Sequence, residues 1–196
     1  MNLRTDNIKV LGVILAGGTS RRMNYHDKHQ LLLDDNSILD HIIKSVDPQV
    51  ETLLFNSNND AVEVELDMLP DIESGLGPMG GIYAGMIYAK QNGYDKLLTV
   101  PSDTPFLPKN LVYKFMKQIE MPIVVACSND QMHPTIALWS LELIEELKVA
   151  LEQRNLRLMS WVAEHEHGLV NWNDPIDPFF NINTPDDLKK AQSFAN

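Results

Sequence analysis

Residues 9–28 read KVLGVILAGGTSRRMNYHDK, and this segment gives the first indication of the fold class. Its first part, Lys9–Leu15, is a short and nearly continuous apolar run, as expected of a β-strand that is buried on both faces of a sheet. The run leads directly into a loop that contains two adjacent glycines, Gly17 and Gly18. A strand buried on both faces that runs directly into a loop is typical of an α/β domain with a parallel sheet.

Strand-like and helical segments alternate along most of the remaining chain. Further strands are expected at 50–55, 95–100, 122–127 and 135–139, and at FFNIN, which ends at Asn183. Helices are expected at 38–46, 82–91, 110–119, over 141–165 with a break near 154–156, and after Thr184. Segment 61–69 fits either a strand or a short helix. The alternation predicts a three-layer α/β/α domain with a mainly parallel, Rossmann-like sheet and helices on both faces.

Composition narrows the class of protein. The 196 residues are 44% hydrophobic, which excludes intrinsic disorder and predicts one domain over 1–196. A net charge of −11 argues against nucleic-acid or anionic-membrane binding, since both need basic surface. No apolar run is long enough for a secretory signal or a membrane span. Cys127 is the single cysteine, so no internal disulfide is possible and a cytoplasmic location is expected.

The loop after the first strand carries an unusual concentration of positive charge. Arg21, Arg22 and Lys28 lie within eight positions of a strongly acidic protein. Glycines let backbone N–H groups approach a ligand closely, which suits phosphate. The loop matches neither G-x-x-x-x-G-K-[ST] nor G-x-G-x-x-G. We therefore predict a phosphate-binding loop of another type, against the alternative of a solvated basic turn at the start of a helix.

Asp103 follows the strand expected at 95–100, in the loop VPSDTPFLP. A carboxylate at the end of a buried strand is held rigidly, and Mg²⁺ is commonly bound by one such carboxylate together with phosphate oxygens. The alternative is that Asp103 caps the turn into the next helix. Beside a cationic phosphate loop, the metal interpretation is favoured.

Other polar residues stand at expected strand ends. Asn56 and Asp71 are candidates for hydrogen bonds to a ribose or a base, or else ordinary turn residues. The glycine-dense turn 75–81 either presents helix N-terminal amides to a ligand or only permits close packing. His133 fits a ligand contact or a structural histidine. His165 and His167 lack a third ligand at a suitable spacing, so no zinc site is expected there.

Several motifs in order along residues 10–190 resemble the molybdenum cofactor guanylyltransferase (MobA) family, whose fold is of the glycosyltransferase-A-like nucleotidyltransferase type. The motif L-A-G-G-x-x-x-R-M-x-x-x-D-K at 15–28 is shared by many nucleotidyltransferases. The more specific motifs are GPMGG at 77–81, VPSDTPFLP at 100–108, HPTIALW at 133–139, RLM at 157–159 and NINTPDDL at 181–188. Two positions depart from the family: Asn24 replaces a usual glycine and Gly80 a frequent alanine. Asparagine tolerates positive φ, so the first turn can survive.

The resemblance implies transfer of GMP from Mg-GTP to molybdenum-loaded molybdopterin. It implies a nucleotide-binding half at about 10–105 and a molybdopterin-binding half at about 106–190. Lys28, Asp103 and Arg22 would be catalytic, with Asp103 as the Mg²⁺ ligand and Arg21 assisting with charge. The GTP site would comprise Leu15, Ala16, Gly17, Gly18, Lys28, Asn56, Asp71 and Asp103. The molybdopterin side would comprise His133, Arg157, Asn181 and Asn183.

Other functions remain open at this point. Within enzymes, the alternatives are the cytidylyltransferase that acts on the same pterin and a sugar-1-phosphate nucleotidyltransferase. A non-catalytic nucleotide-binding adaptor is a different class, and the intact Lys28 and Asp103 argue against it. Molybdoenzymes, their chaperones and other cofactor-biosynthesis proteins are the partners that such an enzyme would serve.

Overall fold

The computed structural model describes residues 8–16, 31–59 and 64–194. In chain order, its elements are β1 (Val10–Leu15), β2 (Leu32–Leu33), β3 (Asn36–Ser37), α1 (Ile38–Val46), η2 (Asp47–Gln49), β4 (Thr52–Asn56), β5 (Met68–Leu69), α2 (Pro78–Gln91), β6 (Lys96–Pro101), α3 (Leu111–Phe115), η3 (Met116–Gln118), β7 (Ile123–Ser128), β8 (Gln131–Ser140), η4 (Leu141–Leu143), α4 (Ile144–Glu152), α5 (Leu158–Ala163), β9 (His167–Trp172) and α6 (Pro185–Gln192).

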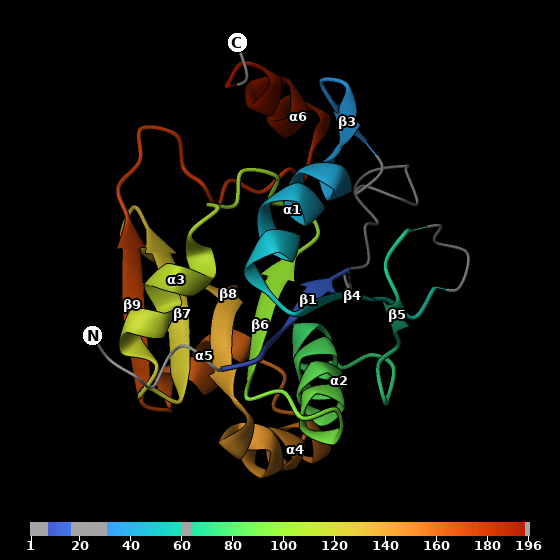
Figure 1. The fold of residues 1–196 in the computed structure, drawn as a ribbon, viewed down its shortest axis with the longest axis vertical. Helices are drawn as coiled ribbons and strands as arrows, with labels where there is room; N and C mark the ends of the chain where they lie inside the picture. Colours follow the sequence, from blue (N-terminus) through green and yellow to red (C-terminus); the bar gives the residue numbers. More distant parts are fainter. Residues whose placement is uncertain (1–7, 17–30, 60–63, 195–196) are drawn as a thin grey trace.

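The main sheet of the described residues has seven strands in the order β5-β4-β1-β6-β8-β7-β9 (Figure 1). Every neighbouring pair is parallel except the two that β8 makes, with β6 and with β7. Strands β2 and β3 form a separate antiparallel pair. The predicted α/β class with a mainly parallel sheet is confirmed.

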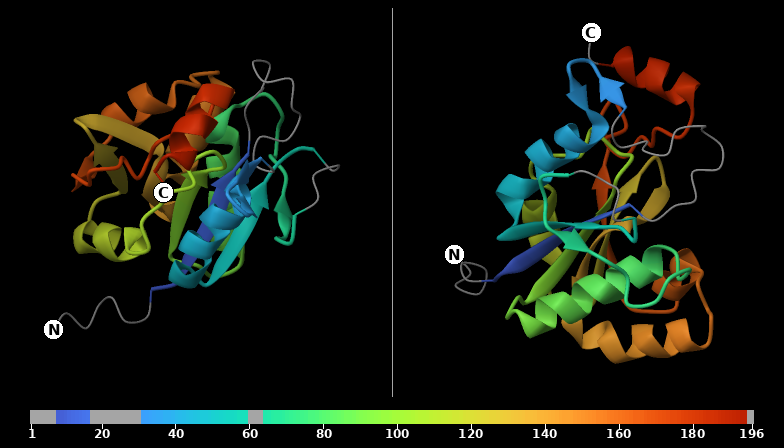
Figure 2. Two further views of the ribbon diagram at one scale, coloured as in Figure 1. Left: turned by 90° about the horizontal axis from the view of Figure 1, so that it is seen from above. Right: turned by 90° about the vertical axis from the view of Figure 1, so that its right-hand side faces the viewer.

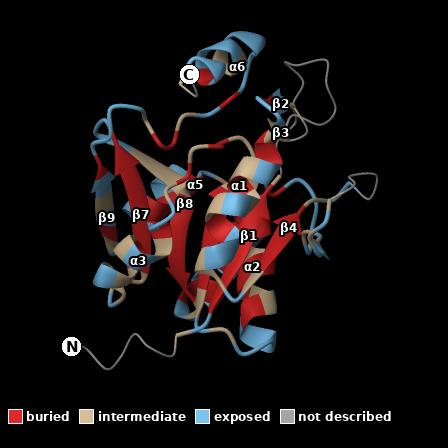
Figure 3. Ribbon diagram, turned by 45° about the horizontal axis from the view of Figure 1, so that its top comes forward, coloured by how far each residue is buried: buried red, intermediate tan, exposed pale blue. Residues whose placement is uncertain are grey.

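Helices cover both faces of this sheet. Helices α1, α3 and α6 contribute to the apolar core on one face, and α2, α4 and α5 to the core on the other (Figure 2). Strand β1 alternates between the two cores, with Val10 and Ile14 in one and Leu11, Val13 and Leu15 in the other. Buried residues accordingly concentrate in the central strands (Figure 3). The predicted three-layer arrangement follows from this two-sided burial.

Two helices begin where the sequence predicts. Ser37 caps α1: its Oγ accepts a hydrogen bond from the Asp40 N–H at 3.0 Å, and the Asp40 carboxylate accepts one from the Ser37 N–H at 2.9 Å. These bonds hold the pKa of Asp40 below its ordinary value. Thr184 and Asp187 form the same reciprocal cap at α6. Each cap satisfies N–H groups that the helix itself leaves without a partner.

Two expectations about local structure were wrong, and one strand was missed. FFNIN forms no strand, because it leaves the sheet and donates the Ile182 N–H to the carbonyl of Asp103 at 2.9 Å. The outer position beside β7 is taken by β9, a strand at His167–Trp172 that was not predicted from the sequence. An edge strand has one neighbour and a mixed burial pattern, which hides its periodicity. Helix α2 starts at Pro78, inside the expected glycine turn, because proline is favoured at the first helical position.

A buried hydrogen bond joins the middle of β6 to β8. The Trp139 Nε1–H donates to Thr99 Oγ1 at 2.8 Å, and both residues are fully buried. We expect Thr99→Val to lower the free energy of unfolding by about 2 kcal/mol, because the indole N–H loses its acceptor away from water. Urea denaturation measures this. Thr52→Val is the matched control: Thr52 accepts from the half-buried Tyr94 hydroxyl, which can turn to water. Equal stability of wild type and Thr99→Val would contradict the prediction.

No helix within the described ranges is long and apolar enough to cross a membrane.

Candidate functional site

The ends of three adjacent strands bring the predicted loops together at one edge of the sheet. Leu15 is in register with Asn56 of β4 on one side and with Pro101 of β6 on the other. Beyond the strands, the Ala16 N–H donates to the Asn56 carbonyl at 3.0 Å, and the Ser102 N–H donates to the Leu15 carbonyl at 3.1 Å. Ligands of open parallel sheets bind at the carboxyl ends of the strands, so this edge is the candidate site.

The cationic part of the first loop lies outside the described residues. Gly17, Gly18, Arg21, Arg22 and Lys28 all fall in the range 17–30. The described chain places the start of this loop, at Ala16, directly beside Asn56. The phosphate-binding role of the loop therefore stays a prediction.

Asn56 and Asp71, both expected at strand ends, are in direct contact. Asn56 is only 3% exposed, and its Nδ2 donates to the Leu69 carbonyl at 2.9 Å and to Asp71 Oδ1 at 2.8 Å. Both amide hydrogens of Asn56 are thus used within the protein. The side chain of Asn56 holds the Asp71 carboxylate at the edge of β4 and β5, where it can accept further hydrogen bonds.

Asn58 is a site residue that was not predicted from the sequence. Its Nδ2 donates to Asp71 Oδ2 at 2.8 Å, while its Oδ1 accepts the Asp71 backbone N–H at 2.8 Å. The signal available in the sequence was the alternation of side-chain direction, which puts residues 56 and 58 on one side of an extended chain. The two asparagines together hydrogen-bond both oxygens of Asp71.

Glycines at the start of α2 allow this helix to approach the same residues. A Cβ built on Gly81 would lie 2.2 Å from Asn56 Oδ1 and 2.8 Å from Leu15 Cδ2. One built on Gly80 would lie 2.9 Å from the Leu76 Cβ and 3.4 Å from the Asp71 carboxyl carbon. Gly77, the N-cap, has φ +58°, which favours glycine. The glycines therefore serve close packing, and this packing is against candidate site residues.

Asp103 stands two residues beyond β6 and is half-buried. Its carbonyl accepts the Ile182 N–H at 2.9 Å, and the following Thr104 is fully buried with its hydroxyl donating to the Pro101 carbonyl at 3.3 Å. These contacts fix the backbone on both sides of the carboxylate. They also bring the exposed Asn181 and Asn183, which flank Ile182, to the Asp103 loop.

The described residues contain no cluster of three or more His, Cys, Asp or Glu side chains able to hold a metal. A single half-buried carboxylate is an oxygen donor of the kind Mg²⁺ uses when substrate phosphates and water complete its shell. The donor set at Asp103 therefore fits Mg²⁺ bound together with a nucleotide.

His133 lies near the start of β8, at the same edge of the sheet, in a chain of hydrogen bonds. Ser128 Oγ donates to Asp177 Oδ1 at 2.8 Å, so the His133 Nε2–H donates to Ser128 Oγ at 2.8 Å. The His133 ring also packs on Phe179, with centroids 5.0 Å apart. Burial lowers the pKa of His133, and Asp177 partly opposes this. Since Ser128 donates to a carboxylate rather than to the histidine, this is not a nucleophilic triad.

Segment 177–183 contacts both His133 and the Asp103 loop. Phe179 packs on His133, and Ile182 bonds to Asp103, so one short stretch of chain touches both. Arg157 stands apart: it is exposed before the first turn of α5, and its side chain makes no hydrogen bond or ion pair with a described residue. The structure thus groups His133, Asn181 and Asn183 along one segment, without Arg157.

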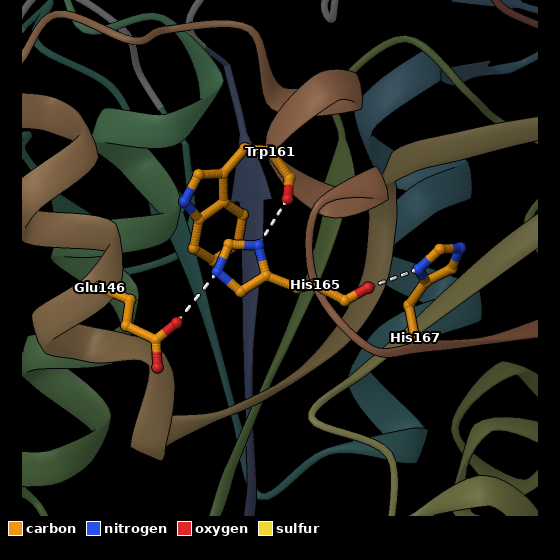
Figure 4. A network of polar contacts seen from close by, with 4 residues as sticks. All are labelled: Glu146, Trp161, His165 and His167. Atoms are coloured by element: carbon orange, nitrogen blue, oxygen red, sulfur yellow. Dashed lines mark hydrogen bonds and ion pairs between the residues drawn. The ribbon is translucent and has the colours of Figure 1, made fainter.

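His165 and His167 belong to a structural network (Figure 4). The two ring nitrogens of His165 face the Trp161 carbonyl at 2.6 Å and Glu146 Oε2 at 3.0 Å, and its ring stacks on Trp161. His167 Nδ1 contacts the His165 carbonyl at 2.9 Å. The contacts tie α5 to α4 and to β9.

Known proteins resemble this chain over nearly its whole length. The family model for the MobA-like NTP transferase domain matches residues 12–168. A molybdenum cofactor guanylyltransferase of Nitrobacter hamburgensis is 35% identical over 94% of this chain and 93% of its own, and one of Rhizobium meliloti is 39% identical over 93% and 90%. Molybdopterin-guanine dinucleotide biosynthesis protein A of Archaeoglobus fulgidus shares the fold, with a TM-score of 0.76 at 19% identity over 95% and 98% of the two chains.

Proposed function

The chain belongs to the family of MobA-like NTP transferases, and we propose that it transfers GMP from Mg-GTP to molybdenum-loaded molybdopterin. A terminal phosphate oxygen of molybdopterin bonds to the α-phosphorus of GTP, and the bond from that phosphorus to the β-phosphate oxygen breaks. The products are molybdopterin guanine dinucleotide and pyrophosphate. The observation that carries the proposal is the convergence of Ala16, Asn56, Asp71 and Asp103 at one edge of the sheet.

In this proposal, the nucleotide half binds GTP through backbone and side chains. Leu15, Ala16, Gly17 and Gly18 approach the nucleotide with their backbone, and Asn56 holds Asp71 toward it. Lys28, with Arg22 and Arg21, offsets the negative charge of the phosphates. The hydrogen bonds from Ala16 to Asn56 and from Asn56 to Asp71 support this arrangement on the described side of the site.

Asp103 would hold Mg²⁺ in this site. A bound divalent cation neutralises phosphate oxygens and the charge that develops on the leaving pyrophosphate. The attacking phosphate is already an anion at pH 7, so the chain needs no general base. The protein's own contribution is therefore positioning and electrostatics, which suits a site built from rigid strand ends and a cationic loop.

We assign the molybdopterin side to residues His133, Asn181 and Asn183, with Arg157 as a further contact. Segment 177–183 supports the first three, because it passes from His133 to Asp103 and so from the second half to the proposed metal ligand. Arg157 is supported by its exposure and by its cationic charge, which suits an anionic substrate.

We place the protein in the cytoplasm. Cys127 is buried, and burial raises the pKa of its thiol, so it is an unreactive packing residue compatible with a reducing compartment. Molybdoenzymes or their chaperones would receive the product there.

The proposal predicts selective turnover of GTP. Purified protein with Mg²⁺ and molybdenum-loaded molybdopterin should release pyrophosphate with GTP far faster than with CTP or ATP. Reactions without molybdopterin are the control for plain hydrolysis. Selective turnover of CTP would replace the proposal by the cytidylyltransferase activity, and turnover only with a sugar 1-phosphate would replace it by a sugar-nucleotide synthesis.

A further inference from the structure

We propose that Asn58 is a positioning residue that sets the Asp71 carboxylate for the nucleotide; the inference rests on the proposed function. Asn58 and Asp71 are thirteen residues apart in the chain and meet at the end of β4. Their contact is reciprocal, since Asn58 gives one hydrogen bond to the Asp71 side chain and takes one from its backbone, each at 2.8 Å. A two-point contact fixes orientation as well as position.

The geometry leaves Asp71 able to accept from a ligand. A carboxylate has about four acceptor positions on its two oxygens. Asn56 donates to Oδ1 and Asn58 donates to Oδ2, each at 2.8 Å. One acceptor position therefore remains on each oxygen, at an edge where Asp71 is only half-buried. A pair of neighbouring donors on the nucleotide suits this arrangement.

Two parts of GTP offer such donors. The guanine base presents the adjacent N1–H and N2–H groups, and the ribose presents two hydroxyls. The base and the ribose can each donate two hydrogen bonds to one carboxylate. ITP lacks the N2 amine and 2′-deoxy-GTP lacks one hydroxyl, so these two nucleotides distinguish the sources.

Of the two asparagines that bond to Asp71, Asn58 is the exposed one and can be replaced without disturbing the packing. Asn56 is buried and also bonds to the Leu69 carbonyl and packs against Gly81, so its loss would disturb the sheet edge and α2. Among the described residues, both side-chain hydrogen bonds of Asn58 are made with Asp71. Removing it therefore frees Asp71 to rotate while leaving the packing intact.

The test measures the Kd for Mg-GTP by calorimetry, and the KM and kcat by steady-state kinetics. We expect Asn58→Ala to raise the Kd and the KM for GTP about tenfold, the size of one hydrogen bond to a charged group, with kcat within about twofold of wild type. The effect should shrink for whichever of ITP or 2′-deoxy-GTP lacks the donor that Asp71 receives. Asn92→Ala is the matched control, because Asn92 is exposed at the other end of α2.

Asn58→Asp provides a readout that a purely structural role would not move. Above the pKa of the new carboxyl pair, two carboxylates face each other and Asp71 is displaced. Two carboxyls so close share one proton with a raised pKa, and that proton restores both contacts. The Kd of Asn58→Asp relative to wild type should therefore fall as the pH drops from 8 to 5.5.

An unchanged Kd in Asn58→Ala, a loss confined to kcat, or a pH-independent Kd ratio for Asn58→Asp would each overturn the inference. Failure of the proposed function looks different: the wild-type protein would bind GTP without transferring GMP to molybdopterin, and the effect of Asn58 on binding would still be measured. Absence of GTP binding by the wild type would overturn both.

Discussion

Asp103→Asn will lower turnover by on the order of 10³-fold while the protein remains folded. The substitution keeps the shape of the side chain and removes its charge, so it tests the metal-binding assignment alone. Loss of one well-placed electrostatic group typically costs 10² to 10³ in rate, and a carboxylate that also places a divalent cation stands at the upper end. The measurement is pyrophosphate release from GTP over a series of Mg²⁺ concentrations.

The expectation depends on how Asp103 is held. Its backbone is tied to Ile182 on one side, and the buried Thr104 anchors the loop on the other. Asp103→Asn keeps these backbone contacts and the size of the side chain, so the melting temperature should stay near that of wild type. Asp95→Asn, before the opposite end of β6, is the control and should retain activity. Near-normal turnover in Asp103→Asn would refute its role as the Mg²⁺ ligand.

Gly81→Ala will damage both stability and nucleotide binding. The new Cβ would fall 2.2 Å from Asn56 Oδ1, far inside any real contact distance, and 2.8 Å from Leu15 Cδ2. Asn56 cannot withdraw without losing its bonds to Leu69 and Asp71. We expect the free energy of unfolding to fall by about 3 kcal/mol, as in severe overpacking, and the Kd for GTP to rise at least about tenfold.

Gly85→Ala on the same helix is the matched comparison. Its Cβ would lie 3.0 to 3.2 Å from the flexible ends of Leu97 and Val13, which can move by a few tenths of an ångström. Alanine also favours helix over glycine by about 1 kcal/mol, which offsets the crowding. Chemical denaturation and GTP calorimetry of the two variants distinguish an effect on the candidate site from a general effect on helix α2. A wild-type free energy of unfolding and a wild-type Kd for GTP in Gly81→Ala would show that α2 does not pack closely against Asn56.

Local patterns carried much of the fold prediction. Three local patterns are confirmed: the apolar run of β1, the N-cap at Ser37 and the Thr184-Pro185 start of α6. Each pattern involves only a few consecutive residues. The grouping of the strand-end loops was predicted from one topological rule, because parallel strands have their carboxyl ends at the same edge of the sheet. Asn56 and Asp71 were expected there and are in contact.

Errors arose where the deciding partner is distant in the chain. β9 takes its position from β7, some forty residues earlier in the sequence, and FFNIN is drawn from the sheet by its bond to Asp103. Neither partner, β7 or Asp103, can be recognised from the hydrophobic periodicity of the segment that it contacts. Alternation along the chain places Asn58 on the same side as Asn56, but its partner Asp71 is identified only when β4 and β5 are paired, so Asn58 was missed.

The α/β class, most of the helices and strands, and the positions of the loops with the candidate site residues could be predicted from the sequence. These depend on burial periodicity, capping and strand-end position, all of which act over a few residues. Tertiary structure alone decided the antiparallel position of β8, the approach of Gly81 to Asn56 and the reciprocal contact of Asn58 with Asp71. Each of these is a contact between segments that only the packed sheet brings together, and a one-dimensional pattern contains no information on such pairs.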